Sequence, residues 1–471
     1  MNELSYRKNT FFLVAAGGLS QLFLAVQKII LARYLKEEGM AIYQSAMCVY
    51  SLFLTLACGG MPLALVHFIS KEHSCGKEEN ILKGLRFTFS VMCSLGLFLS
   101  LLMFLSRGFF SAALKDSGAQ YAIAALSPSV FIVSVGIVAK SCFEGYSNMF
   151  PCAVSQVFES LAKLILAYIF TAFFSIFSLK YAAAGGVLAI TLGETFATVL
   201  LFIFFAPFFK KMKSADMSGM EQIRKRITEY AFPLMVYAIL LSSLDLMENA
   251  VIRNSLLAIK FSDYQADAII FKYSPYTSVF NSVKVSGRLS KEGAGWLYGA
   301  FFGYAMTVIR FPAGLLRTFS VSLFPISARH FAEKNEAALG KFLSKIIKVC
   351  LFVSLSLSIV TIIFAKRITA LIFGCSAYSS MLIFASPLLV FAPASSILTT
   401  VIYSAGKTFV PFLFGFISFM ISIPLCFILI KIPQINILGA AVASISGVIC
   451  EFLMGFLFIK YRLGIEIRLF S

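Results

Sequence analysis

The sequence predicts an all-α integral membrane protein with about twelve transmembrane helices arranged in two six-helix lobes. Composition is the first observation, since 59% of the 471 residues are hydrophobic and 13% are charged, whereas soluble domains carry about 25% charged residues. Apolar runs of about 20 residues, long enough to cross a hydrocarbon core of about 30 Å, also recur along the whole chain. Similar stretches finally appear in the same order in its two halves.

The apolar runs locate the individual spans. The opening MNELSYRKNT leads into the first run without a small-residue cleavage site, so we expect a retained helix there and not a removed signal peptide. A β-barrel would show short alternating segments instead. The expected spans are residues 10–33, 42–69, 84–106, 119–142, 152–175, 182–208, 229–252, 297–325, 342–365, 379–404, 409–430 and 437–459.

Basic residues alternate between the two sets of loops. The loops after the second, sixth and eighth spans are rich in Lys and Arg, whereas the opposite set holds fewer, mostly in residues 254–296. Because Lys- and Arg-rich loops stay in the cytoplasm, we expect a multi-pass protein with both termini there. The basic residues behind the net charge of +18 then set the orientation of the chain in the membrane. We expect no nucleic-acid partner, because these charges lie in short loops between helices.

An internal repeat organises the chain. Residues 69–104 align with 326–364, and GGVLAITLG at 185–193 aligns with GAAVASISG at 439–447. Six is an even number of spans, so both copies would have the same orientation in the membrane. Transporters built from such parallel repeats place their substrate between the halves and rock them for alternating access.

The repeat sets the expected domain boundaries. We expect an N-terminal lobe over residues 1–209, a cytoplasmic linker over 210–228 and a C-terminal lobe over 229–471. The linker, KKMKSADMSGMEQIRKRIT, is either an amphipathic helix on the anionic leaflet or a solvated connection.

The chain shows no pattern for an enzyme, a cofactor or a metal. Its ten cysteines are scattered through apolar runs, and its three histidines form no plausible ligand set. It has no Gly-rich phosphate loop and no nucleophile elbow. Transport without an ATP site would draw on an ion gradient, the membrane potential or substrate flux.

Charges within the fifth span form one candidate site. Glu159 and Lys163 are four residues apart and share a helix face, and Gln156 continues this polar stripe. Charged side chains inside a membrane are costly and usually face a cavity or a partner. The stripe therefore either lines a substrate cavity or neutralises itself.

Two arginines in the eighth span form another candidate site. Arg310 and Arg317 are seven residues apart, hence on one helix face, and Pro312 and Gly314 between them would bend the helix. Neither has an acidic neighbour in the sequence. The partner is either an acid elsewhere in the bundle or an anionic substrate such as a phosphate, which guanidinium groups bind well.

Four acidic residues in the spans are candidates for ion coupling. Their alternative roles are helix capping, structural ion pairing or hydrogen bonding as a buried neutral acid. These residues are Glu194, Asp245, Glu248 and Glu451.

Three groups of short motifs occur in order along the chain. The first group comprises Leu31-Ala32-Arg33, Glu38-Gly39, Tyr43-Gln44, Tyr50-Ser51 and Gly60-Met61-Pro62. The second group comprises Lys140, Phe143, Gly145, Met149, Pro151, Ser155, Gln156, Val157 and Glu159. The third runs from Tyr298-Gly299 through Phe311-Pro312 to Leu323-Phe324-Pro325-Ile326-Ser327. Together these motifs resemble the polysaccharide-export and stage V sporulation protein B-like flippases, which belong to the multidrug/oligosaccharidyl-lipid/polysaccharide exporter superfamily.

The resemblance implies a fold like that of the multidrug and toxin extrusion transporters, in the bacterial cytoplasmic membrane. It implies export of an undecaprenyl-pyrophosphate-linked saccharide, a cell-wall or polysaccharide precursor. Lys28, Arg33 and Arg310 would then attract the pyrophosphate, and precursor-synthesis enzymes would be the protein partners. The peptidoglycan flippases carry an Arg-Asp pair where this chain has Gln27 and Lys28, and an arginine where it has Thr307.

Three alternatives remain beside this hypothesis. Cation-coupled multidrug antiporters of the same fold typically keep an acidic residue in a helix of the N-terminal lobe. The first span has no acid and its only charge well inside is Lys28, which disfavours cationic drugs, although Glu159 and Glu194 keep this alternative open. A membrane-embedded glycosyltransferase would need an acidic metal-binding motif, which the sequence lacks. The last alternative is a membrane protein of sporulation or wall assembly that transports nothing.

Overall fold

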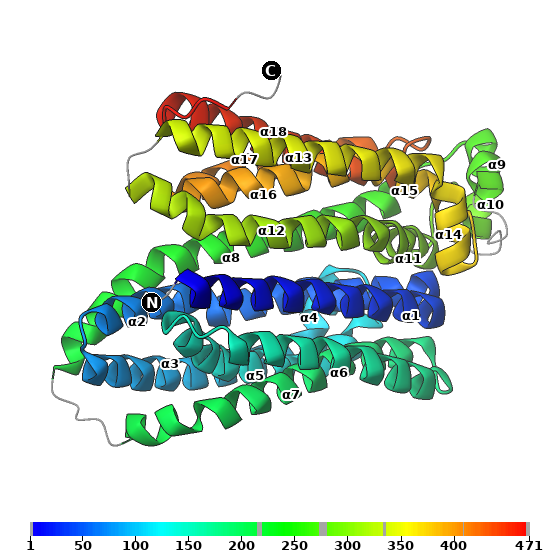
Figure 1. Ribbon diagram of the computed structural model, residues 1–471. Coiled ribbons are helices and arrows are strands. Elements are labelled where there is room, and N and C mark those ends of the chain that lie inside the picture. The colour runs from blue at the N-terminus through cyan, green and yellow to red at the C-terminus, as the bar shows by residue number, and fades with distance from the viewer. Residues whose placement is uncertain (1–2, 214–218, 273–279, 333–335, 408, 468–471) are drawn as a thin grey trace. The chain divides into compact units, whose positions relative to one another are not determined.

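The computed structural model describes every residue of the chain except 1–2, 214–218, 273–279, 333–335, 408 and 468–471. Apart from one isolated β-bridge between Lys260 and Arg288, the regular structure of the described residues is helical (Figure 1). The predicted all-α membrane fold is confirmed.

The chain forms two compact units. The first comprises Met1–Leu35 and Ile42–Leu246, and the second comprises Lys36–Ala41 and Met247–Ser471. The first half of the chain contains α1 (Glu3–Cys58), α2 (Met61–Ser74), α3 (Glu78–Leu105), α4 (Arg107–Ala113), α5 (Ala119–Gly145), α6 (Phe150–Ser175) and α7 (Leu179–Lys213). The second half contains α8 (Met220–Ala258), α9 (Asp263–Lys272), α10 (Asn281–Ser286), α11 (Lys291–Gly299), the π-helix η2 (Ala300–Ala305), α12 (Met306–Ala332), α13 (Glu336–Ile363), α14 (Ala365–Phe373), α15 (Ser379–Ala385), α16 (Leu388–Ser404), α17 (Phe409–Ile430) and α18 (Leu438–Arg462).

Eleven helical segments of the described residues are long and apolar enough to cross a membrane. One of them, Ala15–Ser74, has 60 residues and covers most of the first expected span and all of the second. At 1.5 Å per residue it would extend about 90 Å, three times the thickness of a hydrocarbon core. The helical path is broken at Lys36, whose φ of 51° and ψ of −166° are not helical. This segment therefore supplies two crossings.

The first compact unit continues into α8 as far as Leu246, whereas the predicted C-terminal lobe begins at residue 229. Gly60 lies so close to α8 that an added Cβ would be 2.5 Å from the Ala231 carbonyl oxygen. Ser242 also donates a hydrogen bond to Thr55 Oγ1 at 2.8 Å. These contacts join the part of α8 before residue 247 to α1 and α2, and the predicted lobe boundaries stay a prediction.

The expected linker lies partly outside the described residues, since 214–218 are not among them. Its flanks are helical, with residues 210–213 ending α7 and residues 220–228 beginning α8. Ile223 and Ile227 are buried there against the core of the first unit.

Helix packing follows the same pattern in both units. In the first unit α5 packs against α2, α3 and α7, and α7 packs along α6. In the second unit α16 packs against α12, α13 and α18, and α18 packs along α17. Since the same pairs recur in the same chain order, the packing agrees with the repeat inferred from the sequence.

Glycines at matching positions of the repeat motif lie at close contacts between paired helices. Gly185 and Gly439 each face the preceding helix. An added Cβ at Gly185 would lie 2.8 Å from the Phe170 carbonyl oxygen, and one at Gly439 would lie 2.8 Å from the Leu429 carbonyl carbon. The closing glycines of the motif, Gly193 and Gly447, approach α6 and α17 in the same way. A side chain at any of these positions would push the paired helices apart.

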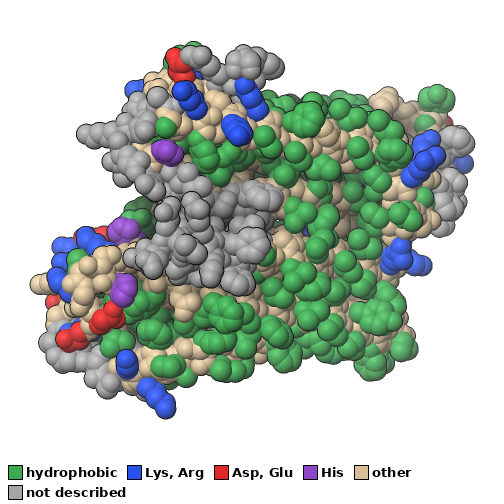
Figure 2. Space-filling model, viewed as in Figure 1, with side chains coloured by type: hydrophobic (Ala, Val, Ile, Leu, Met, Phe, Trp, Pro, Cys, Tyr) green, Lys and Arg blue, Asp and Glu red, His purple; other side chains and the backbone are tan. Residues whose placement is uncertain are grey.

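Large apolar side chains lie on the outside of both units. Leu105, Ile176 and Phe352 are 77%, 78% and 74% exposed. Figure 2 shows hydrophobic side chains across the middle of each unit's visible surface and charged side chains toward the helix ends. Such a surface is unfavourable in water and suits a lipid bilayer.

Gly439→Ala should lower the thermal unfolding temperature, because the added Cβ overpacks the α17–α18 contact at a cost of about 1–3 kcal/mol. Gly108→Ala in α4 is the matched control, because a Cβ there would meet nothing within 4 Å. We expect the control to unfold at or above the parent temperature. Thermal unfolding of the detergent-purified variants measures both, and equal temperatures would contradict the close approach of α17 and α18.

Candidate functional site

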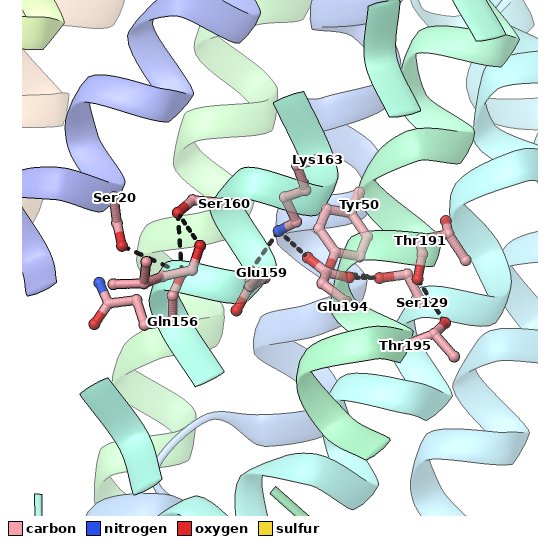
Figure 3. Close-up of polar contacts among 11 residues, drawn as sticks. Ser20, Tyr50, Ser129, Gln156, Glu159, Ser160, Lys163, Thr191, Glu194 and Thr195 are labelled. Atoms are coloured by element: carbon pink, nitrogen blue, oxygen red, sulfur yellow. Dashed lines mark hydrogen bonds and ion pairs between the residues drawn. The ribbon is translucent and has the colours of Figure 1, made fainter. Parts of the chain in front are cut away.

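The polar face of α6 centres on Lys163. Its ammonium Nζ donates to Glu159 Oε1 at 2.6 Å and to Glu194 Oε1 at 3.0 Å (Figure 3). Glu159 lies one turn earlier on α6, whereas Glu194 comes from α7. The side chains of Lys163 and Glu194 are each 10% exposed and that of Glu159 is 33% exposed. Lys163 thus joins two helices through a buried pair and a partly open pair.

The second oxygen of Glu194 is held by hydroxyl groups from two further helices. Tyr50 of α1 donates to Glu194 Oε2 at 3.0 Å, and Ser129 of α5 donates to the same oxygen (Figure 3). The Tyr50 and Ser129 hydroxyl oxygens are 2.9 Å apart. We call Tyr50, Ser129, Glu159, Lys163 and Glu194 the carboxylate cluster. It connects α1, α5, α6 and α7 inside the first unit.

A glycine makes room for the cluster. Gly193, next to Glu194, faces Lys163 so closely that an added Cβ would overlap the Lys163 Cγ. The lysine stem crosses α7 at this point and brings its ammonium to the Glu194 carboxylate. The glycine that the repeat singled out is therefore also required by the cluster.

The cluster sets two carboxylates against one ammonium, so one proton separates its negatively charged form from its neutral form. Burial disfavours a net charge. Glu159 is the member with the greatest exposure. The Lys163 ammonium is already shared by two acids, which leaves it poorly suited to recruit an anionic ligand.

Gln156 lies one turn before Glu159 and is half-buried. Its backbone carbonyl accepts a hydrogen bond from the Ser20 hydroxyl at 3.2 Å, which joins α6 to α1 (Figure 3). The structure thus places Gln156, Glu159, Lys163 and Glu194 in one neighbourhood. Their predicted substrate and ion contacts remain predictions.

The predicted cationic residues lie on two other helices. Lys28 is half-buried and Arg33 is exposed, both on α1 within the first unit. Arg310 and Arg317 are exposed on α12 within the second unit. No described residue forms an ion pair or hydrogen bond with the Arg310 guanidinium. These four residues also stay predicted contacts.

The remaining candidate acids lie on α8 and α18. Asp245 is exposed on α8. Glu248 accepts from the Ser422 hydroxyl at 3.4 Å, and Glu451 accepts from the Thr399 hydroxyl at 3.5 Å. Within the described part of the chain, no three His, Cys, Asp or Glu side chains are arranged to hold a metal ion.

Two members of the carboxylate cluster, Tyr50 and Ser129, were not predicted as site residues from the sequence. Tyr50 belongs to the quoted Tyr50-Ser51 motif, so a signal existed, although it named no partner. Ser129 lies in an apolar run beside Pro128 and gave no signal. Both meet Glu194 through tertiary packing, which residue spacing does not predict.

Comparison with protein families matches both halves of the chain. The family model described as polysaccharide biosynthesis protein matches residues 6–252. The family model described as Lipid II flippase MurJ matches residues 294–470.

Two related proteins come from Bacillus subtilis (strain 168). Stage V sporulation protein B is 24% identical over 472 residues, which span 100% of this chain and 86% of that protein. Lipid II flippase MurJ is 22% identical over 493 residues, which span 98% of this chain and 84% of that protein.

Solved transporter structures share the fold. An inward-facing multidrug resistance transporter of the MATE family has a TM-score of 0.69 and 14% identity, over 94% of each chain. A eukaryotic MATE transporter has a TM-score of 0.67 and 13% identity, over 97% of this chain and 96% of that one. This likeness establishes the transporter fold.

Lys163→Met should destabilise the first unit by about 3–5 kcal/mol, because it leaves the Glu194 carboxylate buried without its counter-ion. Lys163→Met combined with Glu194→Gln should recover much of that loss. Glu159→Gln should lower the stability of the first unit less than Lys163→Met does, since it leaves the Lys163–Glu194 pair in place. Thermal unfolding in detergent tests this order. A double variant no more stable than Lys163→Met alone would show that the pair does not carry the effect.

Proposed function

The chain belongs to the polysaccharide biosynthesis protein family, and we propose that it moves an undecaprenyl-pyrophosphate-linked saccharide across the bacterial cytoplasmic membrane by alternating access. The related flippase and the transporter fold support movement of a lipid-linked precursor. The polyprenyl tail would remain in lipid while the charged headgroup crosses through the protein.

The exposed guanidinium of Arg310 inside a candidate membrane span is the observation that carries this proposal. It lies within the candidate span Lys291–Arg317, and its side chain is exposed. A guanidinium is costly inside a membrane, so one without an ion pair among the described residues needs an anionic partner from elsewhere. The planar donor fork of arginine matches phosphate oxygens, which fits a pyrophosphate group. Arg317 lies on the same helix face as a second donor.

Lys28 and Arg33 would add positive charge on α1. Charge neutralisation is strong where the dielectric is low, so cations near the headgroup path would lower the cost of moving a pyrophosphate. Lys163 has a different role in this proposal, because Glu159 and Glu194 already share its charge. We assign the carboxylate cluster to coupling and charge balance in the first unit.

The cargo differs from the peptidoglycan precursor in this proposal. At two positions where the peptidoglycan flippases carry charged residues, Gln27 and Thr307 are buried here, with 2% and 5% exposure. The Thr307 hydroxyl, in α12, donates to the Gly303 carbonyl of the preceding π-helix η2 at 2.7 Å. Neither residue supplies the charge found in those flippases, which favours a different saccharide on the same type of lipid carrier.

Arg310→Gln should reduce flipping about tenfold or more, because a charge-assisted contact to the pyrophosphate is lost. Arg310→Lys should be intermediate, since it keeps the charge and loses the fork. The exposed loop residue Lys407 supplies the control Lys407→Gln, which should leave flipping unchanged. The assay follows undecaprenyl-pyrophosphate-linked saccharides in proteoliposomes. Unchanged flipping by a normally folded Arg310→Gln variant would refute the assignment.

The carboxylate cluster favours a second candidate function, a cation-coupled multidrug antiporter. That function predicts export of a cationic dye from cells, and loss of this export in Glu194→Gln. The flippase proposal predicts that dye accumulation is the same with and without the protein. A chain that moves neither the dye nor the lipid-linked saccharides would instead support a role in wall or spore assembly without transport.

A further inference from the structure

A short segment of α1 departs from its neighbours. Residues Lys36–Ala41, which we call the strap, belong to the second unit, while Met1–Leu35 before it and Ile42 after it belong to the first. The chain therefore leaves the first unit for six residues and returns. By the distribution of basic loops, this stretch between the first two spans is expected on the extracellular side.

The strap is docked through its backbone. Gly299, at the end of α11, faces the strap so closely that an added Cβ would overlap the Glu37 carbonyl. Gly303 of η2 also faces the strap closely, since an added Cβ at Gly303 would lie 2.6 Å from the Met40 Cβ. Met40 and Ala41 are each 2% exposed. The Glu38-Gly39 and Tyr298-Gly299 motifs therefore lie on the two sides of one contact. This contact gives both motifs a structural role, although neither belongs to the proposed substrate path.

One polar bond anchors the strap. Glu37 is 3% exposed, and among the described residues its side chain accepts one hydrogen bond, from the Tyr378 hydroxyl. Tyr378 is itself buried and packs against Tyr304 and Trp296, with ring centroids 4.5 and 6.1 Å away. A buried carboxylate with a single donor remains poorly solvated. Release of the strap would return it to water.

The backbone at Lys36 opposes docking. Its φ of 51° with ψ of −166° lies in a region that is essentially confined to glycine. The strain disappears if the strap leaves its seat and Lys36 relaxes. Docking buries Met40 and Ala41, whereas release relaxes Lys36 and rehydrates Glu37, so each state is favoured by contacts or backbone geometry that the other lacks.

We propose that the strap is a releasable latch, which docks on α11, η2 and Tyr378 in one state of the transport cycle and detaches in another. The π-helix η2 beneath it is the kind of helix irregularity that often marks functional sites. The latch rests on the proposed alternating access. Lys36 supplies the strain that favours release, and Gly299 supplies the space that permits docking.

Cysteine labelling measures the latch directly. Met40→Cys is introduced into a chain whose ten cysteines have been replaced, and a maleimide is added to permeable membrane vesicles. Gly299→Ala, which blocks docking, should raise the labelling rate about tenfold. Tyr378→Phe removes the hydrogen bond to Glu37 and should also raise the labelling rate about tenfold. This second variant keeps the test valid if Gly299→Ala fails to fold. Tyr264→Cys, at an 84% exposed position, should label equally in every background.

Lys36 provides the opposite test. Lys36→Gly removes the strain and should lower Met40→Cys labelling about tenfold. Lys36→Ala loses the same charge but keeps a Cβ, so it should label like the parent. Lys36→Gly should also slow flipping about tenfold because the docked state persists, while Lys36→Ala should not.

Two results would overturn the latch. One is equal labelling of Met40→Cys in the parent, Gly299→Ala, Tyr378→Phe and Lys36→Gly backgrounds. The other is the expected labelling order combined with parental flipping in Lys36→Gly, which would make the strap a fixed anchor during transport. A chain that flips no lipid at all would refute the proposed function, while the labelling order would still decide whether the strap is released.

Discussion

Lys163 lies between the carboxylates of Glu159 and Glu194 in a part of the first unit that water hardly reaches. A buried charge is tolerated when it is paired and hydrogen-bonded, and this requirement explains the arrangement around it. Gly193 lets the lysine stem approach α7, and the hydroxyls of Tyr50 and Ser129 satisfy the second Glu194 oxygen. Four helices of the first unit are thereby held around one ammonium group.

The second unit repeats the helix packing without repeating this chemistry. Gly447 occupies the place of Gly193 in the repeat, but the side chain that it faces on α17 is Ser418, at 2.7 Å from an added Cβ. The neighbouring Ser422 hydroxyl bonds Glu248. The two units therefore share close glycine contacts between paired helices but differ in the ionisable groups beside them. The exposed cations of the second unit, Arg310 and Arg317, lie instead on α12.

Local patterns in the sequence predicted much of the fold and part of the candidate site. Apolar runs located the spans, because only a helix satisfies its own backbone in lipid. The four-residue spacing of Glu159 and Lys163 predicted their contact, because helix geometry alone places them together. Glu194 was recognised as a buried acid without its partners. The predicted lobe boundaries stay a prediction, while the contacts of Gly60 and Thr55 with α8 arise from packing that residue spacing does not show.

The sequence by itself determined that the chain is a helical membrane protein built from two related halves, since hydrophobic length and repetition are properties of the chain alone. Tertiary structure decided which charges are neutralised and which stay open. The sequence already pairs Lys163 with Glu159, but only packing adds Glu194 from another helix, while Arg310 remains exposed. The strap likewise depends on Gly299 and Tyr378, far along the chain. Such contacts arise from packing between distant segments, which no local pattern encodes.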